Sequence, residues 1–330
     1  MIHRIGVFAN TRGMKDRLAA KTTERVAELQ VTDCYLVLNP IRHRTPTLFI
    51  TEDRIRSLTR ALQDIGADVH FMIYPKKHEL KPFADKLIPL AETLHARSIL
   101  LDLEENWSSS VLKNIELYLD QFEDAFLSSQ VTVGIYGYGF LEPKVKPFAR
   151  IVDYVTADAQ DTSPTKSHRS WKNADPSDIV MILPAYKPHT VPSMANQLKE
   201  TRTLTDPGIS EIVYWWLTTL YSDNQPNEKG WFLRSIASRI RASERDLIPD
   251  WALEEKSIRN AFINNLNYSI SLGWSKHMKD VLNLIGLMPW PSAREWVSSI
   301  KRWQRSHRIS PAPGYIGPQT WTKMQTALGL

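Results

Sequence analysis

Eight short apolar runs recur along the first two thirds of the chain, and their regular spacing is the feature that most limits its fold. Each run is rich in Val, Ile, Leu and Tyr, and more polar segments separate the runs. Near-continuous apolar runs are typical of parallel strands that are buried on both faces. The expected strands cover residues 4–10, 34–40, 68–75, 98–106, 131–139, 153–160, 178–186 and 211–219.

The segments between these runs have the pattern of amphipathic helices. In residues 51–66, for example, Ile55, Leu58, Leu62 and Ile65 form a helical stripe behind an acidic first turn. Eight strand-and-helix units match a closed (β/α)8 barrel of the TIM type better than an open doubly wound sheet. No glycine-rich phosphate loop follows the first run, which removes the main reason to expect a nucleotide-binding sheet.

Length, charge and cysteine content narrow the class of protein further. A chain of 330 residues can bury a large core and hold one large domain with a small one beside it. The net charge of +5 suits attraction to an anionic polymer such as peptidoglycan, teichoic acid or nucleic acid. Cys34 is the lone cysteine, which excludes an internal disulfide and argues against a structural zinc site. We therefore expect neither a metal nor another cofactor.

The chain begins directly on a strand pattern, without the basic leader and apolar segment of a secretory signal. No apolar run approaches the roughly 18 residues of a membrane span. We therefore expect synthesis in the cytoplasm. A substrate in the periplasm or cell wall would then be reached through lysis, a phage particle or a specialised secretion machine.

The fourth run ends in a cluster of acids, "SILLDLEENW" over residues 98–107. Strand alternation points Asp102 and Glu104 to one face, about 6 to 7 Å apart along the backbone, and Glu105 to the other. Two carboxyl groups on one face can cut a glycosidic bond, one as proton donor and one as nucleophile, base or cation stabiliser. Trp107 can stack on a sugar ring. The alternative is that these acids only cap the next helix.

Barrel enzymes gather their active sites at the carboxyl ends of the strands, so the other residues there are candidates for substrate binding. Aromatic rings, acids and amides suit a carbohydrate, because sugars present apolar C–H faces and hydroxyl edges. For each aromatic residue, Trp216 above all, the alternative is core packing. The predicted substrate-binding residues are Asn10, Trp107, Tyr136, Tyr138, Asp158, Gln160, Tyr186 and Trp215.

The sequence "LLDLEENW", followed one unit later by "VGIYGYG", resembles the barrel of the glycoside hydrolase family 25 lysozymes. That family carries an Asp-x-Glu motif on its fourth strand. The resemblance implies that Glu104 is the general acid and that Asp102 is the nucleophile or the oxazolinium-stabilising partner. The chain departs from the family in its first strand, where Gly6, Val7 and Phe8 stand in place of a Gly-Ile-Asp pattern.

The C-terminal segment has a second set of motifs. It contains a helix ending in Trp303-Gln304 and then a loop with Gly314, Gly317 and Pro318 ahead of Trp321. This pattern resembles the small three-helix peptidoglycan-binding domain, and "MKDVLNLIGLMPWP" upstream resembles its first helix. The resemblance implies that peptidoglycan is the partner. The alternative is that these aromatic residues only hold the small domain together.

These observations predict three parts and leave three functions open. The parts are a glycosidase-like barrel over residues 1–245, a helical connection over 246–275 and a peptidoglycan-binding-like helical domain over 276–330. The favoured function is a muramidase-like, antibacterial cell-wall hydrolase, such as a phage endolysin or a secreted effector, that acts without nucleic acid. The second is a non-catalytic glycan-binding protein, and the third is an intracellular barrel enzyme that acts on another sugar. The sequence does not indicate an oligomeric state.

Overall fold

The computed structural model divides into two compact units. Unit 1 contains residues 1–219 and 236–247, and unit 2 contains residues 220–235 and 248–330. The structure describes residues 2–11, 16–39, 48, 50–75, 80–103, 123–127, 129–137, 148–149, 151–171, 174, 176–186, 188–205, 208–222, 224–287 and 291–330.

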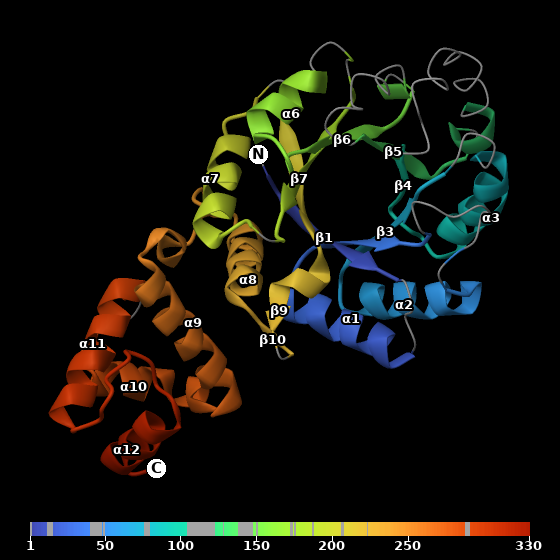
Figure 1. Cartoon of the computed structure of the whole chain (residues 1–330). Helices are drawn as coiled ribbons and strands as arrows, with labels where there is room; N and C mark the ends of the chain where they lie inside the picture. The colour runs from blue at the N-terminus through green and yellow to red at the C-terminus, as the bar shows by residue number, and fades with distance from the viewer. Residues whose placement is uncertain are drawn as a thin grey trace. The chain divides into compact units, whose positions relative to one another are not determined.

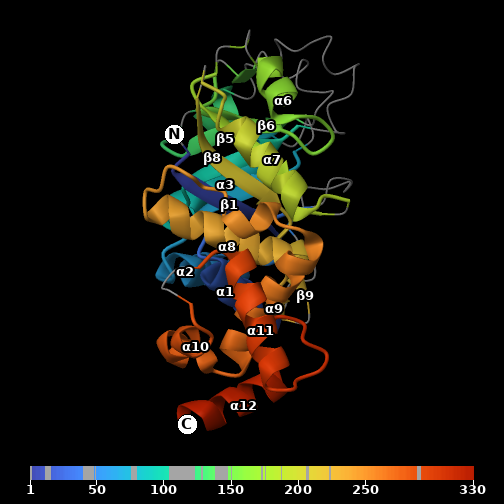
Figure 2. The ribbon, with the colours of Figure 1, turned by 90° about the vertical axis from the view of Figure 1, so that its left-hand side faces the viewer.

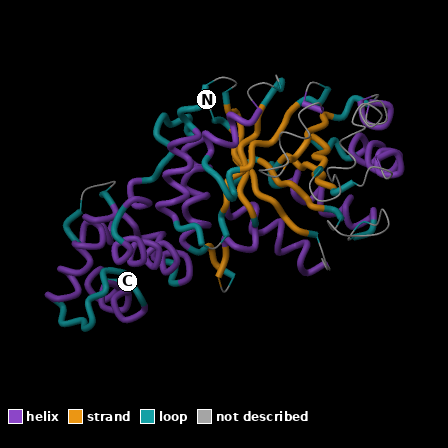
Figure 3. The backbone as a smooth tube through the Cα atoms, turned by 45° about the horizontal axis from the view of Figure 1, so that its top comes forward, coloured by secondary structure: helices purple, strands orange, loops and turns teal. Residues whose placement is uncertain are grey.

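Unit 1 is a closed barrel of eight parallel strands, which confirms the predicted fold class (Figure 1). The strands pair in chain order, and the last closes onto the first. Figure 3 shows the strands gathered at the centre with helices outside them. The strands are β1 (Arg4–Asn10), β2 (Asp33–Val37), β3 (Asp68–Ile73), β4 (Ser98–Asp102), β5 (Thr132–Gly137), β6 (Tyr154–Asp158), β7 (Ile179–Pro184) and β8 (Ile209–Trp215).

The barrel interior is a packed core, built by every second residue of each strand. One cluster of buried side chains includes Phe8 of β1, Val37 of β2, Met72 of β3, Leu100 of β4 and Val213 of β8. The residues between them point outward, where helices cover the barrel and bury this second face as well. Burial on both faces explains why the sequence shows continuous apolar runs rather than alternation.

The helices on the barrel present their apolar stripes to the strands. In α2, Ile55, Leu58 and Leu62 of the predicted stripe are buried, whereas Ile65, just past the helix end, is 40% exposed. The helices that the structure describes from α1 to α8 are α1 (Asp16–Leu29), α2 (Glu52–Asp64), α3 (Leu80–Thr93), α6 (Pro164–Trp171), α7 (Val191–Thr201) and α8 (Glu228–Arg241). Short elements lie at Glu123–Leu127 and Leu217–Leu220, whereas the paired strands β9 (Tyr221–Ser222) and β10 (Gln225–Pro226) belong to unit 2.

Unit 2 is mainly helical and has its own small core, in which Trp274, Ile300, Trp303 and Trp321 pack together. Its helices gather around this core in two views (Figures 1 and 2). Ser292 and Glu295 form a capping box that starts α11. The helices are α9 (Lys256–Ser271), α10 (Met278–Leu284), α11 (Ala293–Ser306) and α12 (Pro318–Leu328), with 3-10 turns at Asp250–Leu253 and Trp274–His277.

Buried amides organise the loop between α11 and α12. Gln304 donates to the Tyr315 carbonyl and the Thr320 hydroxyl, each at 2.9 Å, and accepts from the Gly314 amide at 3.0 Å. Asn265 of α9 donates to the Gly314 carbonyl at 3.0 Å and accepts from the Ile316 amide at 2.8 Å. The last α-helix of the expected connection, α9, therefore takes part in the core of unit 2. Among the described helices, none has the length and apolar character that a membrane span requires.

Candidate active site

Four of the predicted site residues are buried at the carboxyl end of the barrel strands. Asp102, Asp158 and Trp215 are the last residues of β4, β6 and β8, and Tyr136 on β5 pairs with Asp102 in the strand register. All four have the inward-pointing alternation of their strands. Asp102 and Asp158 are each 1% exposed, so the strands hold two carboxyl groups in a dry environment.

Asp158, Tyr136 and Gln160 form one hydrogen-bonded group. The Tyr136 hydroxyl donates to the Asp158 carboxylate. The Gln160 side-chain amide donates to Oδ2 of Asp158 at 3.1 Å and to the Tyr136 hydroxyl at 3.0 Å. The Gln160 backbone amide donates to Oδ1 of Asp158 at 2.8 Å. The structure thus brings together three residues that the sequence named as separate candidates, and their predicted contact with a substrate stays a prediction.

Burial gives Asp158 an unusual proton affinity. Removal from water raises the pKa of its carboxyl group to about 7, and the hydrogen bonds from Tyr136 and Gln160 offset only part of that rise. Tyr186, two residues past the end of β7, lies close enough that the charge of Asp158 helps raise its pKa, after burial and Asp161. A carboxyl group that changes charge near neutral pH can accept or give up a proton during a reaction.

The aromatic residues at this end divide into buried and partly exposed ones. Trp215 is 4% exposed and stacks on Phe8 with ring centroids 3.9 Å apart, and Tyr136 meets the edge of Trp215 at 5.9 Å. Trp216 and Tyr186 are only partly buried. The predicted stacking on Trp215 is therefore obstructed by Phe8 on one face, whereas Trp216 and Tyr186 have the exposure that contact with a sugar needs.

The other predicted residues are unevenly described. Asn10 is exposed at the end of β1. Glu104, Trp107 and Tyr138 lie outside the described residues. The structure places Asp102 at the end of β4, and the pairing of Asp102 with Glu104 as catalytic acids stays a prediction from the sequence.

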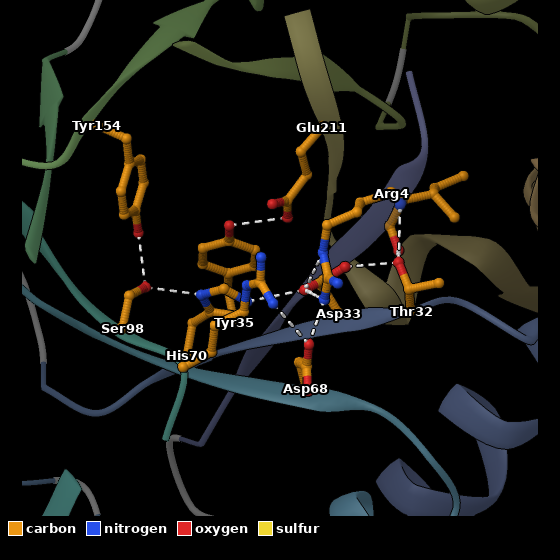
Figure 4. Close-up of polar contacts among 11 residues, drawn as sticks. Arg4, Thr32, Asp33, Tyr35, Asp68, His70, Ser98, Tyr154 and Glu211 are labelled. Atoms are coloured by element: carbon orange, nitrogen blue, oxygen red, sulfur yellow. Dashed lines mark hydrogen bonds and ion pairs between the residues drawn. The ribbon is translucent and has the colours of Figure 1, made fainter. Parts of the chain in front are cut away.

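A second polar cluster, which the sequence analysis missed, fills the opposite end of the barrel (Figure 4). Asp33 accepts from Arg4 and from Nε2 of His70 at 2.9 Å, and Nδ1 of His70 meets the Ser98 hydroxyl at 2.7 Å. The Ser98 hydroxyl in turn lies 2.8 Å from that of Tyr154. In the sequence, this cluster could have been found from the polar residues at inward positions near the starts of the strands.

The contacts in this cluster resemble those of a Ser-His-Asp triad, but the surroundings do not suit catalysis. Ser98 is 1% exposed and already shares its hydroxyl with Tyr154. Burial, with the charges of Arg97 and Arg4, outweighs Asp33 and lowers the pKa of His70. Burial alone would raise the pKa of Asp33, but hydrogen bonds and charges from His70 and Arg4 hold it below its usual value. The cluster is therefore an internally satisfied structural network.

The same cluster contains the side chains best placed to bind a metal ion among the described residues. Ligand atoms of Asp33, His70 and Glu211 all lie within 4.8 Å of one another. However, Arg4 already supplies a positive charge to Asp33, and both ring nitrogens of His70 have partners. Glu211 accepts from Tyr35 at 2.8 Å, and burial followed by the charge of Asp33 raises its pKa to about 8. Arg4 therefore takes the place that a metal ion would have to occupy.

Comparison with known proteins finds likeness in structure alone. No family model and no curated protein sequence matches the chain. A GH113 β-1,4-mannanase superposes with a TM-score of 0.55 and 10% identity, over 74% of this chain and 100% of its own. A GH113 β-mannanase from Alicyclobacillus acidocaldarius gives 0.53 and 11%, over 73% and 98%. A GH30 endoxylanase from Clostridium papyrosolvens gives 0.51 and 12%, over 72% of each chain.

At this level of identity the likeness establishes the fold. Unit 1 is a (β/α)8 barrel of the type that glycoside hydrolases use. The three structures belong to glycoside hydrolase families 30 and 113, so the resemblance to family 25 stays a prediction from the sequence motifs. Because one fold hosts many activities, the function has to be argued from the residues at the carboxyl end of the barrel.

Proposed function

We propose that the chain is a cell-wall glycoside hydrolase, muramidase-like, that cleaves the glycan strand of peptidoglycan. The observation that carries the proposal is the position of Asp102, inward-pointing and last on β4, where barrel enzymes gather their active sites. Glu104 follows two residues later in the sequence, where the predicted alternation places it on the same face. The buried Asp158 on β6 supplies a third carboxyl group at the same end of the barrel.

In this mechanism the two acids on the fourth strand have different roles. Glu104 donates a proton to the oxygen of the leaving sugar. Asp102 either attacks the anomeric carbon or stabilises the positive charge that develops on the sugar. Loss of the general acid alone removes a factor of about 10² to 10⁴ in rate. Gln160, which Asp158 and Tyr136 hold in place, is partly exposed and offers its amide to sugar hydroxyls, and Trp216 and Tyr186 offer ring surface.

The C-terminal helical domain is proposed to hold the enzyme on the wall. The motif around Gln304, Gly314 and Trp321 supports this role, since it resembles a peptidoglycan-binding domain. A second binding site on the same chain raises the local concentration of substrate without changing the chemistry of the barrel.

A second candidate function is non-catalytic glycan binding, and one contact favours it. Phe8 stands where family 25 has an aspartate in its first strand, and its ring stacks on Trp215 instead of presenting a charge. A barrel without that aspartate can bind a glycan and leave it intact.

Mass spectrometry of fragments released from purified peptidoglycan separates the two candidates. New reducing ends on muramic acid are the result expected for a muramidase. New reducing ends on glucosamine would instead identify a glucosaminidase. Binding to the wall with all glycan strands intact would support the non-catalytic function and contradict the hydrolase.

A further inference from the structure

The net positive charge of the chain comes entirely from its C-terminal part. Residues 248–330 contain ten Lys and Arg residues and five Asp and Glu residues, whereas residues 1–247 contain equal numbers of the two kinds. The net charge of +5 is therefore the charge of the C-terminal part, and the barrel sequence is neutral overall.

Within that part, the excess is concentrated at the end of α11 and beyond it. Residues 296–330 contain no Asp or Glu at all. We use the name basic face for Lys301, Arg302, Arg305 and Arg308. Arg302, Arg305 and Arg308 are exposed, and Lys301 is partly buried. The three that belong to α11 lie on the side away from the core residues Ile300 and Trp303, and Arg308 follows the helix.

The basic face differs in its partners from Arg294 and Arg259, two arginines of unit 2 that form ion pairs. Arg294, at the start of α11, pairs with Glu254 at 2.6 Å, and Arg259 of α9 pairs with Glu228. Among the residues that the structure describes, no ion pair involves any member of the basic face. Attraction to the negative end of the helix dipole accounts for Arg305, the basic residue in the last turn of α11. It does not account for Lys301, one turn earlier, or Arg308, beyond the helix.

An aromatic pair follows the loop residue that Lys301 approaches. The Lys301 stem passes so close to Gly314 that a Cβ there would meet its Cε at 3.0 Å. The next residue, Tyr315, is partly exposed and stacks on Tyr268 with ring centroids 5.7 Å apart. Charge next to ring surface suits a ligand that carries both carboxylates and apolar groups, such as the peptide stems on a glycan. A bare polyphosphate would use only the charge.

We propose that the basic face binds the carboxylates of the peptide stems of peptidoglycan, with Tyr315 and Tyr268 against the adjoining apolar groups. The inference rests on the proposed function, because it takes the substrate of the barrel as the ligand of unit 2. Guanidinium groups match carboxylate geometry with paired hydrogen bonds, and three of the four cations are arginines. Neighbouring cations without acidic partners also repel one another, and a multivalent anion relieves that repulsion.

The test is co-sedimentation of the full-length protein with purified peptidoglycan stripped of teichoic acid, at several salt concentrations. One variant combines Arg302→Gln, Arg305→Gln and Arg308→Gln. Its matched control combines Lys256→Gln, Lys276→Gln and Lys279→Gln, which removes the same charge from exposed positions of the same unit. We expect the first variant to bind about tenfold more weakly at low salt, with a flatter salt dependence, and the control to bind within about twofold of the wild type.

A second arm identifies the ligand. Amidation of the stem carboxylates should weaken binding of the wild type about as much as the arginine variant does. An equal loss of peptidoglycan binding in both triple variants would overturn the proposal, because net charge alone would then explain binding. Binding only to walls that retain teichoic acid, or preferential binding to DNA, would also overturn it. The arginine variant should hydrolyse short soluble glycans at the wild-type rate, so failure of the hydrolase proposal would appear there and not in sedimentation.

Discussion

At the scale of single residues, Asp158 is the group whose ionisation the structure most clearly changes. Its carboxyl pKa of about 7 means that it exchanges its proton in the pH range where the protein is expected to work. Asp158→Asn removes that ionisation and disturbs the hydrogen bond from Tyr136. We expect the step near pH 7 in the kcat/KM profile to disappear and KM to rise about tenfold, since a hydrogen bond to a charged group contributes roughly 1.5 to 3 kcal/mol.

Asp161→Asn provides the control for this prediction, because Asp161 is exposed and only three residues away. The pH profile of that variant should match the wild type. If Asp158→Asn kept the step near pH 7, another group would be responsible for it, and Asp158 would have no part in substrate binding.

At the scale of single elements, the sequence predicted the eight strands and candidate residues at their carboxyl ends. It did not predict the polar cluster at their starts. The positions of the strands followed from the apolar runs. Asp102, Tyr136 and Asp158 share one end of the barrel because parallel strands bring their carboxyl ends together. The contact of Phe8 with Trp215 could not be predicted, since it joins the first and last strands across the closure of the barrel. Asp33 and His70 were missed because each looks like an ordinary polar residue near a strand start until the barrel brings them together.

Glu211, in the second polar cluster of the barrel, predicts how the stability of the fold depends on pH. Glu211 has a folded-state pKa of about 8, above its ordinary value, so the folded protein binds more protons than the unfolded chain between about pH 4.5 and 8. Its contribution to stability is therefore complete below that window and is lost as the pH rises through it. Glu211→Gln should flatten the dependence measured by urea unfolding at several pH values. An unchanged slope would mean that Glu211 does not hold its proton in the folded state.

In the helical unit, Asn265 hydrogen-bonds α9 to the loop before α12. Asn265→Ala would leave the Gly314 carbonyl and the Ile316 amide without their partner inside the protein. We expect a loss of about 2 to 4 kcal/mol in the unfolding free energy of this unit, measured by urea unfolding. Asn260→Ala, at an exposed position of the same helix, should leave it unchanged. If both variants unfolded at the same urea concentration as the wild type, the loop would hold its shape without Asn265.

At the scale of the whole molecule, the division of labour between the units can be tested by deletion. The deletion begins at Ile248, because α9 belongs to the helical unit. Loss of a tethered binding site should reduce the rate on insoluble walls several-fold and leave the rate on short soluble fragments unchanged. Equal rates on intact walls for a soluble truncated barrel would contradict the targeting role.

The proposed hydrolase activity depends on Asp102, at the end of the fourth strand, and on Glu104 after it. The most direct measurement is the rate of wall hydrolysis by Glu104→Gln beside Glu105→Gln. The two changes are chemically identical and one residue apart, but the alternation expected from the sequence places only Glu104 on the face of Asp102. We predict a loss of at least ~100-fold for Glu104→Gln, with the fold intact, and a far smaller effect for Glu105→Gln. Wild-type rates for Glu104→Gln would contradict the central claim and move the active site elsewhere.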